Sequence, residues 1–256
     1  MTRHLETALL TKRATGRKLL VPYITGGFPG WERAIEAAAH AGADAVEIGL
    51  PFSDPVMDGP VIQEASQTAL DAGATPVAIL QAIATLDIDI PLAVMCYYNT
   101  VFRMGHERFA ATLAGSGISA AIVPDLPLEE SGEWCTAADA AGVETVMLAA
   151  PTAPDARLPL ICDRARGFVY AVGLLGVTGE RAALAESALT MARRLKAVTD
   201  KPVLVGVGVS NAQQAFEASH VADGVIMGAA VMRRMIDGGP DAVGDFVGEV
   251  RAALGH

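Results

Sequence analysis

A repeated pair of segments constrains the fold of this chain more than any other feature. A short run rich in β-branched residues is followed each time by a longer Ala-rich stretch, and the pair recurs along the whole chain. Most of the short runs are continuously apolar, which is typical of parallel strands covered by helices on both faces. The eight runs expected to be strands are 19–25, 45–49, 91–97, 119–125, 143–148, 167–172, 202–207 and 223–227.

The longer stretches carry helix signals at both ends. Several begin with a capping residue, such as Thr75 before Pro76, and several end at a glycine, such as Gly42 or Gly117. A further stretch at 5–15 precedes the first strand, and we expect it to form an extra N-terminal helix that plugs the bottom of a barrel. The other expected helices include 31–41, 76–86, 106–116, 130–141, 187–199, 211–219 and 242–254.

Eight β/α units in 256 residues match the size of a (β/α)₈ TIM barrel. A doubly wound open sheet is the competing α/β fold, but no GxGxxG motif follows the first predicted strand. No linker or shift in composition marks a second domain. We therefore expect residues 1–256 to form a single TIM-barrel domain.

Composition narrows the kind of partner that this chain binds. Lys and Arg number 19 against 29 Asp and Glu, so the formal charge of −10 disfavours nucleic acid and anionic membranes as partners. Three scattered cysteines and the lack of an apolar N-terminal segment favour a cytoplasmic location. The five histidines lack the spacing of metal ligands, so we expect no metal site.

Glu47 lies inside an otherwise apolar predicted strand. An ionisable group on the interior face of a barrel costs free energy unless it is paired or neutralised. Glu47 can be a core acid held by an ion pair, or it can be turned between the strand and a helix. The favoured interpretation is a partly buried carboxyl whose raised pKa makes it an acid and a base near pH 7.

A proline-rich loop at 49–63 follows that strand and contains Asp54 and Asp58. Its three prolines make the loop stiff, so it can hold a carboxylate over the mouth of the barrel, where TIM barrels have their active sites. A turn-forming role suits Asp54, which precedes Pro55. For Asp58, which precedes Gly59, the residues alone leave a turn and a catalytic role equally open.

Glycines follow the seventh and eighth predicted strands, in GVGVS at 206–210 and GAAV at 228–231. Backbone N–H groups at such turns can approach an anion, and a helix N-terminus adds a favourable field. The sequence therefore predicts a phosphate site, although tight turns alone would also explain these glycines. The Gly-rich segment 173–187 has the composition of a mobile lid or of a plain flexible loop.

Together these motifs closely resemble the family of tryptophan synthase alpha subunits. The resemblance extends over nearly the whole chain, and its most specific part is PFSDPVMDGPVIQ at 51–63. The other matching stretches are VPYITGGFP at 21–29, VEIGL at 46–50, YYNTVF at 97–102, PDLPLEES at 124–131, GVTG at 176–179 and GVGVS at 206–210.

The resemblance implies a lyase of L-tryptophan biosynthesis that cleaves indole-3-glycerol phosphate, by a retro-aldol reaction, to indole and glyceraldehyde 3-phosphate. It implies that Glu47 and Asp58 are the catalytic pair and that Thr178 in the lid meets Asp58 when the lid closes. Residues that it places at the indole are Tyr23, Ile62, Tyr97 and Tyr170. Residues that it places at the phosphate are Gly179, Gly208, Gly228 and Ala229.

The same resemblance implies a partner and no cofactor in this chain. The partner is a beta subunit that uses pyridoxal phosphate, in an α₂β₂ heterotetramer, with the loops 50–62 and 97–103 as the docking surface. Two positions depart from the usual family pattern: Gly173-Leu174 stand where Ser-Arg is common before GVTG, and Ala229 stands where Ser is common. We expect a weaker or water-mediated phosphate contact at Ala229, and altered lid closure.

Three other functions stay open at this level. The chain can be a free-standing indole-3-glycerol phosphate lyase, or a catalytically silent barrel that only activates a beta subunit. The presence of Glu47 and Asp58 argues against the silent barrel. A different phosphate-handling barrel of tryptophan or histidine biosynthesis would be expected to place lysine or paired aspartates at strand ends, and no lysine occurs between Lys18 and Lys196.

Overall fold

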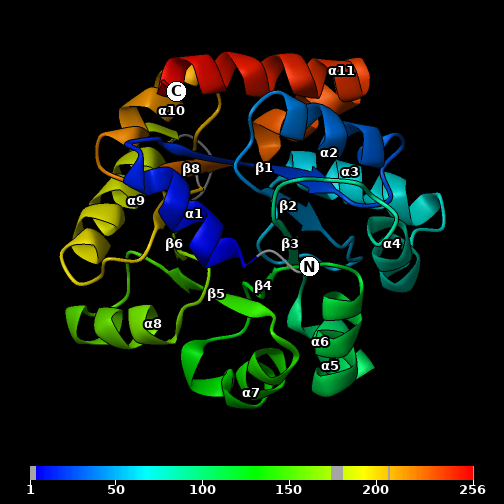
Figure 1. Ribbon diagram of the computed structural model, residues 1–256, viewed down its shortest axis with the longest axis horizontal. Coiled ribbons are helices and arrows are strands. Elements are labelled where there is room, and N and C mark those ends of the chain that lie inside the picture. The colour runs from blue at the N-terminus through cyan, green and yellow to red at the C-terminus, as the bar shows by residue number, and fades with distance from the viewer. Residues whose placement is uncertain (1–3, 174–180, 207, 256) are drawn as a thin grey trace.

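Eight parallel strands close into a barrel in chain order, with β8 paired to β1. The computed structural model describes residues 4–173, 181–206 and 208–255. Each strand overlaps one of the eight predicted runs, so the predicted TIM barrel is confirmed (Figure 1). The strands are β1 Leu19–Thr25, β2 Val46–Gly49, β3 Leu92–Met95, β4 Ala120–Ile122, β5 Glu144–Ala149, β6 Val169–Ala171, β7 Val203–Val205 and β8 Gly224–Met227.

Helices surround the barrel and bury its outer face. They are α1 Leu5–Ala14, α2 Trp31–His40, α3 Pro60–Asp71, α4 Pro76–Ile83, α5 Tyr98–Met104, α6 His106–Gly115, α7 Gly132–Ala141, α8 Leu158–Arg164, α9 Arg181–Lys196, α10 Ala212–Ser219 and α11 Ala229–Leu254, with 3₁₀ turns η1 Leu128–Glu130 and η2 Asp155–Arg157. α11 bends where Gly239 takes a φ of 73° before Pro240. None of the helices in the described chain has the length and apolar character needed to cross a lipid bilayer.

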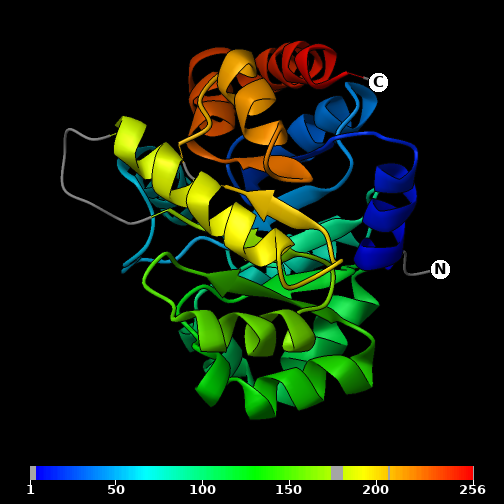
Figure 2. The ribbon, with the colours of Figure 1, turned by 90° about the vertical axis from the view of Figure 1, so that its left-hand side faces the viewer.

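The N-terminal helix α1 closes one end of the barrel, as predicted (Figure 2). Leu5 and Leu9 are fully buried and pack against inward-facing side chains of the strands. The carboxylate of Glu144, at the start of β5, accepts hydrogen bonds from the backbone N–H groups of Leu5 (2.6 Å) and Glu6 (3.1 Å). Glu144 thus satisfies the free N–H groups of the first helical turn and fixes α1 against the sheet.

Two helices occupy stretches that the sequence predicted to be loops. α3 begins at Pro60, inside the expected loop 50–62, because proline is pre-organised for the first helical position. α5 replaces most of the expected loop 97–103. Its first backbone N–H, from Tyr98, donates to Oδ1 of Asp125 at 2.8 Å. This cap lies 27 positions away in the chain, so the local sequence does not reveal it.

Two further helices differ from the sequence prediction. α9 begins at Arg181, inside the predicted lid 173–187, so the second half of that segment is helical. α8 was not among the predicted helices, because its seven residues are too few for the helical repeat of apolar residues to be distinct.

Candidate active site

The side chain of Glu47 points into the barrel from β2. Val46 and Ile48 pack outward against the helices and Ala45 belongs to the barrel interior, so the alternation of the strand places Glu47 inside. Glu47 is 1% exposed, and its Oε2 has no hydrogen-bond partner among the described residues. Burial, together with the nearby charge of Asp58, raises the pKa of Glu47 to about 8. At pH 7 its carboxyl is therefore mostly neutral.

Asp58 lies in the loop between β2 and α3, and this loop is tied to Tyr97 at the end of β3. The backbone N–H of Met57 donates to the Tyr97 hydroxyl at 3.0 Å, and the side-chain amide of Gln63 donates to the backbone oxygen of Asp58 at 2.8 Å. Burial raises the pKa of Asp58, while a hydrogen bond from Tyr97 opposes that rise. Asp58 lies near enough to Glu47 for its charge to add to the rise in the pKa of Glu47.

Two buried tyrosines, Tyr23 on β1 and Tyr170 on β6, lie within range of the charge of Glu47. Burial raises the pKa of both Tyr23 and Tyr170 far above the usual range, and the charge of Glu47 contributes to each rise. Both rings fit because the neighbouring strands carry glycines. A Cβ atom added at Gly49 would lie 1.9 Å from the Tyr23 hydroxyl, and one added at Gly206 would lie 2.1 Å from the Tyr170 hydroxyl. Gly206, expected at the phosphate site, thus makes room for a ring.

The strand ends of β7 and β8 lie side by side, where the sequence predicted the phosphate site. Gly208 has a φ of +85°, a conformation that favours glycine. Gly228 is the N-cap of α11, so Ala229 contributes its backbone N–H to the free first turn of that helix. A Cβ atom added at Gly228 would lie 3.8 Å from Cβ of Tyr23 and 3.9 Å from Cδ1 of Ile62. This helix terminus therefore borders the same site.

The structure brings most of the predicted site residues together at the C-terminal mouth of the barrel. Thr178 and Gly179, the two lid positions, lie outside the described residues. Asp54 is exposed and its carboxylate accepts a hydrogen bond from the neighbouring Ser53 hydroxyl at 2.5 Å, in keeping with the turn-forming role. The sequence analysis missed Gly49, although a glycine two residues after Glu47 on the same strand face could have indicated a large neighbouring ring.

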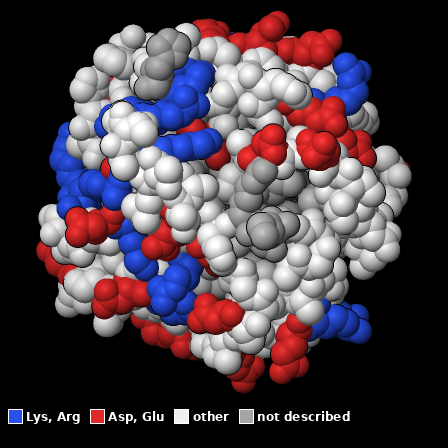
Figure 3. Space-filling view, viewed as in Figure 1, with Lys and Arg blue, Asp and Glu red and all other residues white. Residues whose placement is uncertain are grey.

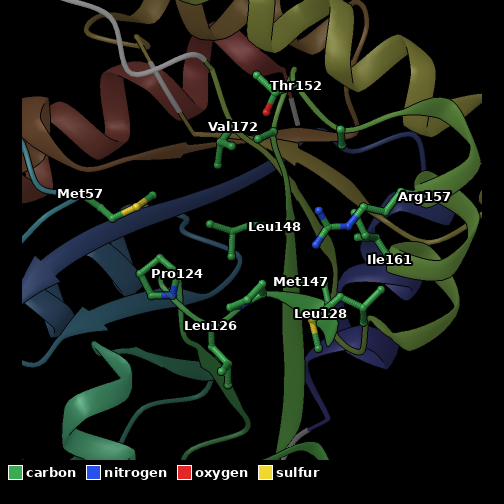
Figure 4. A pocket seen from close by; sticks show the side chains of 13 residues that line it. Met57, Pro124, Leu126, Leu128, Met147, Leu148, Thr152, Arg157, Ile161 and Val172 are labelled. Atoms are coloured by element: carbon green, nitrogen blue, oxygen red, sulfur yellow. The ribbon is translucent and has the colours of Figure 1, made fainter. Parts of the chain in front are cut away.

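A cavity of about 200 Å³ opens beside this group (Figure 4). Met57, next to Asp58, contributes to its wall, as do Leu148 and Val172 at the ends of β5 and β6. The sequence analysis did not single out these apolar positions. Leu148 and Val172 alternate with the outward-facing residues of β5 and β6, so strand periodicity could have indicated that these two face the mouth. Among the described residues, no group of three or more His, Cys, Asp or Glu side chains is placed to hold a metal ion.

The chain matches the tryptophan synthase alpha chain family over residues 9–243. The tryptophan synthase alpha chain of Streptomyces coelicolor is 46% identical over 94% of this chain and 90% of that relative. That of Thermobifida fusca is 42% identical over 98% of this chain and 97% of the relative.

Solved structures agree with the sequence relatives. A chain of Mycobacterium tuberculosis tryptophan synthase superimposes with a TM-score of 0.91 at 35% identity, covering 99% of both chains. Tryptophan synthase subunit alpha from Legionella pneumophila gives a TM-score of 0.87 at 29% identity over 98% of this chain and 97% of that one. The chain therefore belongs to the tryptophan synthase alpha chain family, as its motifs predicted.

Proposed function

We propose that this chain cleaves indole-3-glycerol phosphate to indole and glyceraldehyde 3-phosphate, with Glu47 and Asp58 as its catalytic carboxyl groups. Its family makes the chain a carbon–carbon lyase of tryptophan biosynthesis. The observation that carries the assignment of residues is the buried carboxyl of Glu47, which is mostly neutral at pH 7 and lies near Asp58. A carboxyl with a pKa close to the working pH can both donate and accept a proton.

The reaction requires two proton transfers on one substrate. The indole ring must gain a proton at its ring carbon C3 before it can leave. The hydroxyl on the adjacent side-chain carbon must lose its proton, so that its electron pair forms the aldehyde as the carbon–carbon bond breaks. The pair of electrons from that bond then returns to the ring and restores the indole. One proton therefore enters the ring and one leaves the hydroxyl.

In this proposal Glu47 carries out both transfers. Its neutral carboxyl donates the proton to C3, and the carboxylate that results accepts the proton of the hydroxyl. Glu47 ends the cycle protonated, as it began. The raised pKa of Glu47 supports this order, because a carboxyl of ordinary pKa would have no proton to donate at pH 7.

Asp58 stabilises the charge that the first transfer creates. Protonation at C3 places positive charge on the ring nitrogen, and an ionised Asp58 that accepts the N–H hydrogen bond attracts that charge. The stiff loop and the hydrogen bond from Met57 to Tyr97 hold Asp58 over the barrel mouth. The apolar walls formed by Tyr23, Tyr170 and Ile62 suit the indole ring.

The phosphate belongs, in this proposal, at the ends of β7 and β8. The N–H groups of Gly208, Gly228 and Ala229 are available there, and the dipole of α11 adds a favourable field in a chain of net charge −10. The resemblance to the family adds Gly179 to this phosphate site and assigns Thr178 to a contact with Asp58; both residues lie outside the described part of the chain.

The partner in this proposal is a beta subunit of tryptophan synthase that uses pyridoxal phosphate, in an α₂β₂ assembly. Two large apolar side chains support a docking surface on this side of the barrel. Val56 in the loop after β2 is 76% exposed and Phe102 on α5 is 66% exposed. We further propose that residues 1–256 form one cytoplasmic domain that itself needs no cofactor.

Replacement of Glu47 by glutamine tests the catalytic assignment. Glutamine keeps the shape of the side chain but cannot transfer the proton, so we expect indole release to fall about 10²- to 10⁴-fold. The control is Glu144→Gln, which removes another carboxyl with a raised pKa at the opposite end of the barrel. If Glu47→Gln retains near wild-type turnover while remaining folded, the mechanism is wrong. Measurement of indole release with and without a beta subunit distinguishes a free-standing lyase from a subunit whose activity depends on its partner.

A further inference from the structure

The side chain of Tyr97 holds the loop that carries Asp58. The Met57 N–H group donates to the Tyr97 hydroxyl at 3.0 Å, and the ring of Phe52 stacks on the Tyr97 ring with centroids 5.2 Å apart. The hydroxyl also donates to Asp58 itself and opposes the rise in the pKa of that carboxyl. These contacts fix the loop only if Tyr97 is itself fixed.

Strand β4 holds the backbone on both sides of Tyr97. Before it, the Cys96 N–H group donates to the carbonyl oxygen of Ile122 at 3.0 Å, which continues the pairing of β3 with β4. After it, the Tyr98 N–H group donates to Oδ1 of Asp125 at 2.8 Å. This N–H group begins α5, so the helix itself provides no acceptor for it. Asp125 therefore extends the hold of β4 beyond the end of the strand.

The segment that carries Asp125 also lies beside the loop that carries Asp58. Pro124 and Leu126, the two neighbours of Asp125 in the chain, line the same cavity as Met57 of that loop (Figure 4). A carboxylate is a favourable acceptor at the start of α5, because the free N–H groups and the helix dipole both attract negative charge. The ends of β2, β3 and β4 are thus linked through two neighbouring tyrosines.

We propose that Asp125 is a positioning residue for the cleavage reaction: its carboxylate fixes the first turn of α5, and Tyr97 passes that placement to the loop that carries Asp58. The inference rests on the proposed function, because it assumes that an ionised Asp58 assists the reaction. Without the acceptor, the first turn of α5 can shift and carry Tyr97 with it. A small displacement of a catalytic group is enough to slow a reaction.

Two substitutions of Asp125 separate its hydrogen bond from its charge. Asp125→Ala removes the acceptor, and we expect kcat on indole-3-glycerol phosphate to fall about 3- to 10-fold with little change in KM. The acidic limb of the pH–rate profile should move to higher pH, because the hydrogen bond from Tyr97 to Asp58 weakens. Asp125→Asn keeps an oxygen acceptor and should restore most of both properties. Loss of charge alone would move the limb to lower pH, since it would favour the ionised form of Asp58.

Thr75→Ala is the matched control for the loss of a helix cap. The Thr75 hydroxyl accepts from the Ala78 N–H group at 3.2 Å at the start of α4, a helix that carries no residue of the proposed site. Thr75→Ala should lower stability but leave kcat and the acidic limb unchanged. An acidic limb that stays in place or moves to lower pH in Asp125→Ala would overturn the proposal.

A double-mutant cycle tests whether Asp125 acts through Tyr97. If it does, adding Asp125→Ala to Tyr97→Phe should change kcat by less than about twofold, because the link is already broken. Losses in kcat that multiply in the double variant would show that the two residues act independently, and the proposal would be wrong.

Amide hydrogen exchange at Met57 follows the link without the reaction. Because this N–H group donates to the Tyr97 hydroxyl, we expect its exchange to become about tenfold faster in Asp125→Ala and to stay near the wild-type rate in Asp125→Asn and Thr75→Ala. If the wild type cleaves the substrate but exchange at Met57 is unchanged in Asp125→Ala, this inference is wrong and the proposed function stands. If the wild type does not cleave the substrate, the proposed function fails and this inference fails with it.

Discussion

At the scale of single residues, the protonation of Glu47 is the property on which the proposed chemistry depends. The carboxyl is buried and lies near a second acid, so both influences disfavour its charged form. An ordinary surface glutamate would be ionised at neutral pH and could act only as a base. The position of one side chain on the inner face of β2 thus decides its chemistry.

The raised pKa of Glu47 also predicts how stability depends on pH. The folded state retains a proton on Glu47 between its ordinary pKa of 4.5 and its raised pKa of about 8, while the unfolded state has lost it. Stability should therefore decrease as pH rises through this interval, on the order of a few kcal/mol. Denaturant unfolding of wild type and Glu47→Gln at several pH values isolates this contribution. The prediction is contradicted if the free energy of unfolding changes with pH in the same way for wild type and for Glu47→Gln.

Tyr97 is expected to act as a positioning residue for Asp58. Tyr97→Phe removes the acceptor of the Met57 N–H group and the hydrogen bond that opposes the rise in the pKa of Asp58. We expect kcat to fall about 3- to 30-fold and the acidic limb of the pH–rate profile to move to higher pH.

The adjacent tyrosine provides a matched control for that experiment. The hydroxyl of Tyr98 is hydrogen-bonded to Nε2 of His106, the first residue of α6, at 2.9 Å. Tyr98→Phe should therefore leave the acidic limb where it is. An unchanged limb in Tyr97→Phe would instead show that Tyr97 does not control Asp58.

At the scale of whole elements, the loop after β2 and helix α5 extend from adjacent strands of the barrel. The hydrogen bond from Met57 to Tyr97 joins them directly, and the rings of Phe52 and Tyr97 stack with centroids 5.2 Å apart. A partner that docks on these elements would therefore contact the segment that carries Asp58. This arrangement provides a physical route by which the proposed beta subunit could affect the catalytic site.

Phe102 is the side chain with which to test this docking surface. Phe102→Ser removes a large exposed ring from α5, and we expect affinity for the beta subunit to fall about tenfold or more. Leu160 on α8 is similarly exposed, at 59%, and lies outside the proposed docking elements, so Leu160→Ser serves as the control. Equal effects of the two substitutions on the measured dissociation constant would contradict this surface.

At the scale of the whole molecule, two buried acidic residues, Asp44 and Asp223, form ion pairs that connect separate parts of the chain at the N-terminal face of the barrel. Asp44 is fully buried and pairs with Lys12 of α1, with Arg17 and with Arg251 near the end of α11. Asp223 similarly pairs with cations of α1 and α9. Figure 3 shows this face, where Lys and Arg side chains gather on the left-hand part although the chain as a whole is acidic.

Removal of the Asp44 charge should destabilise the entire barrel. Asp44→Asn leaves Arg251, whose side chain is 9% exposed, without its countercharge, and we expect the free energy of unfolding to fall by about 3–5 kcal/mol. The control is Asp241→Asn, which removes an exposed pair with Arg33 and should change stability by less than about 1 kcal/mol. Chemical denaturation of both variants measures the difference, and similar losses would contradict a special role for Asp44.

The sequence by itself determined the barrel, its eight strands and the family, because apolar runs, glycine stops and the 51–63 motif are properties of local sequence. It also identified the residues proposed for catalysis. Only the tertiary structure decided that Glu47 is mostly neutral at pH 7, that Asp125 caps α5 and that Met57 borders a cavity. These properties depend on contacts between segments that are distant in the chain, such as the 27 positions that separate Asp125 from Tyr98. Local patterns cannot encode the burial and charge that such contacts create.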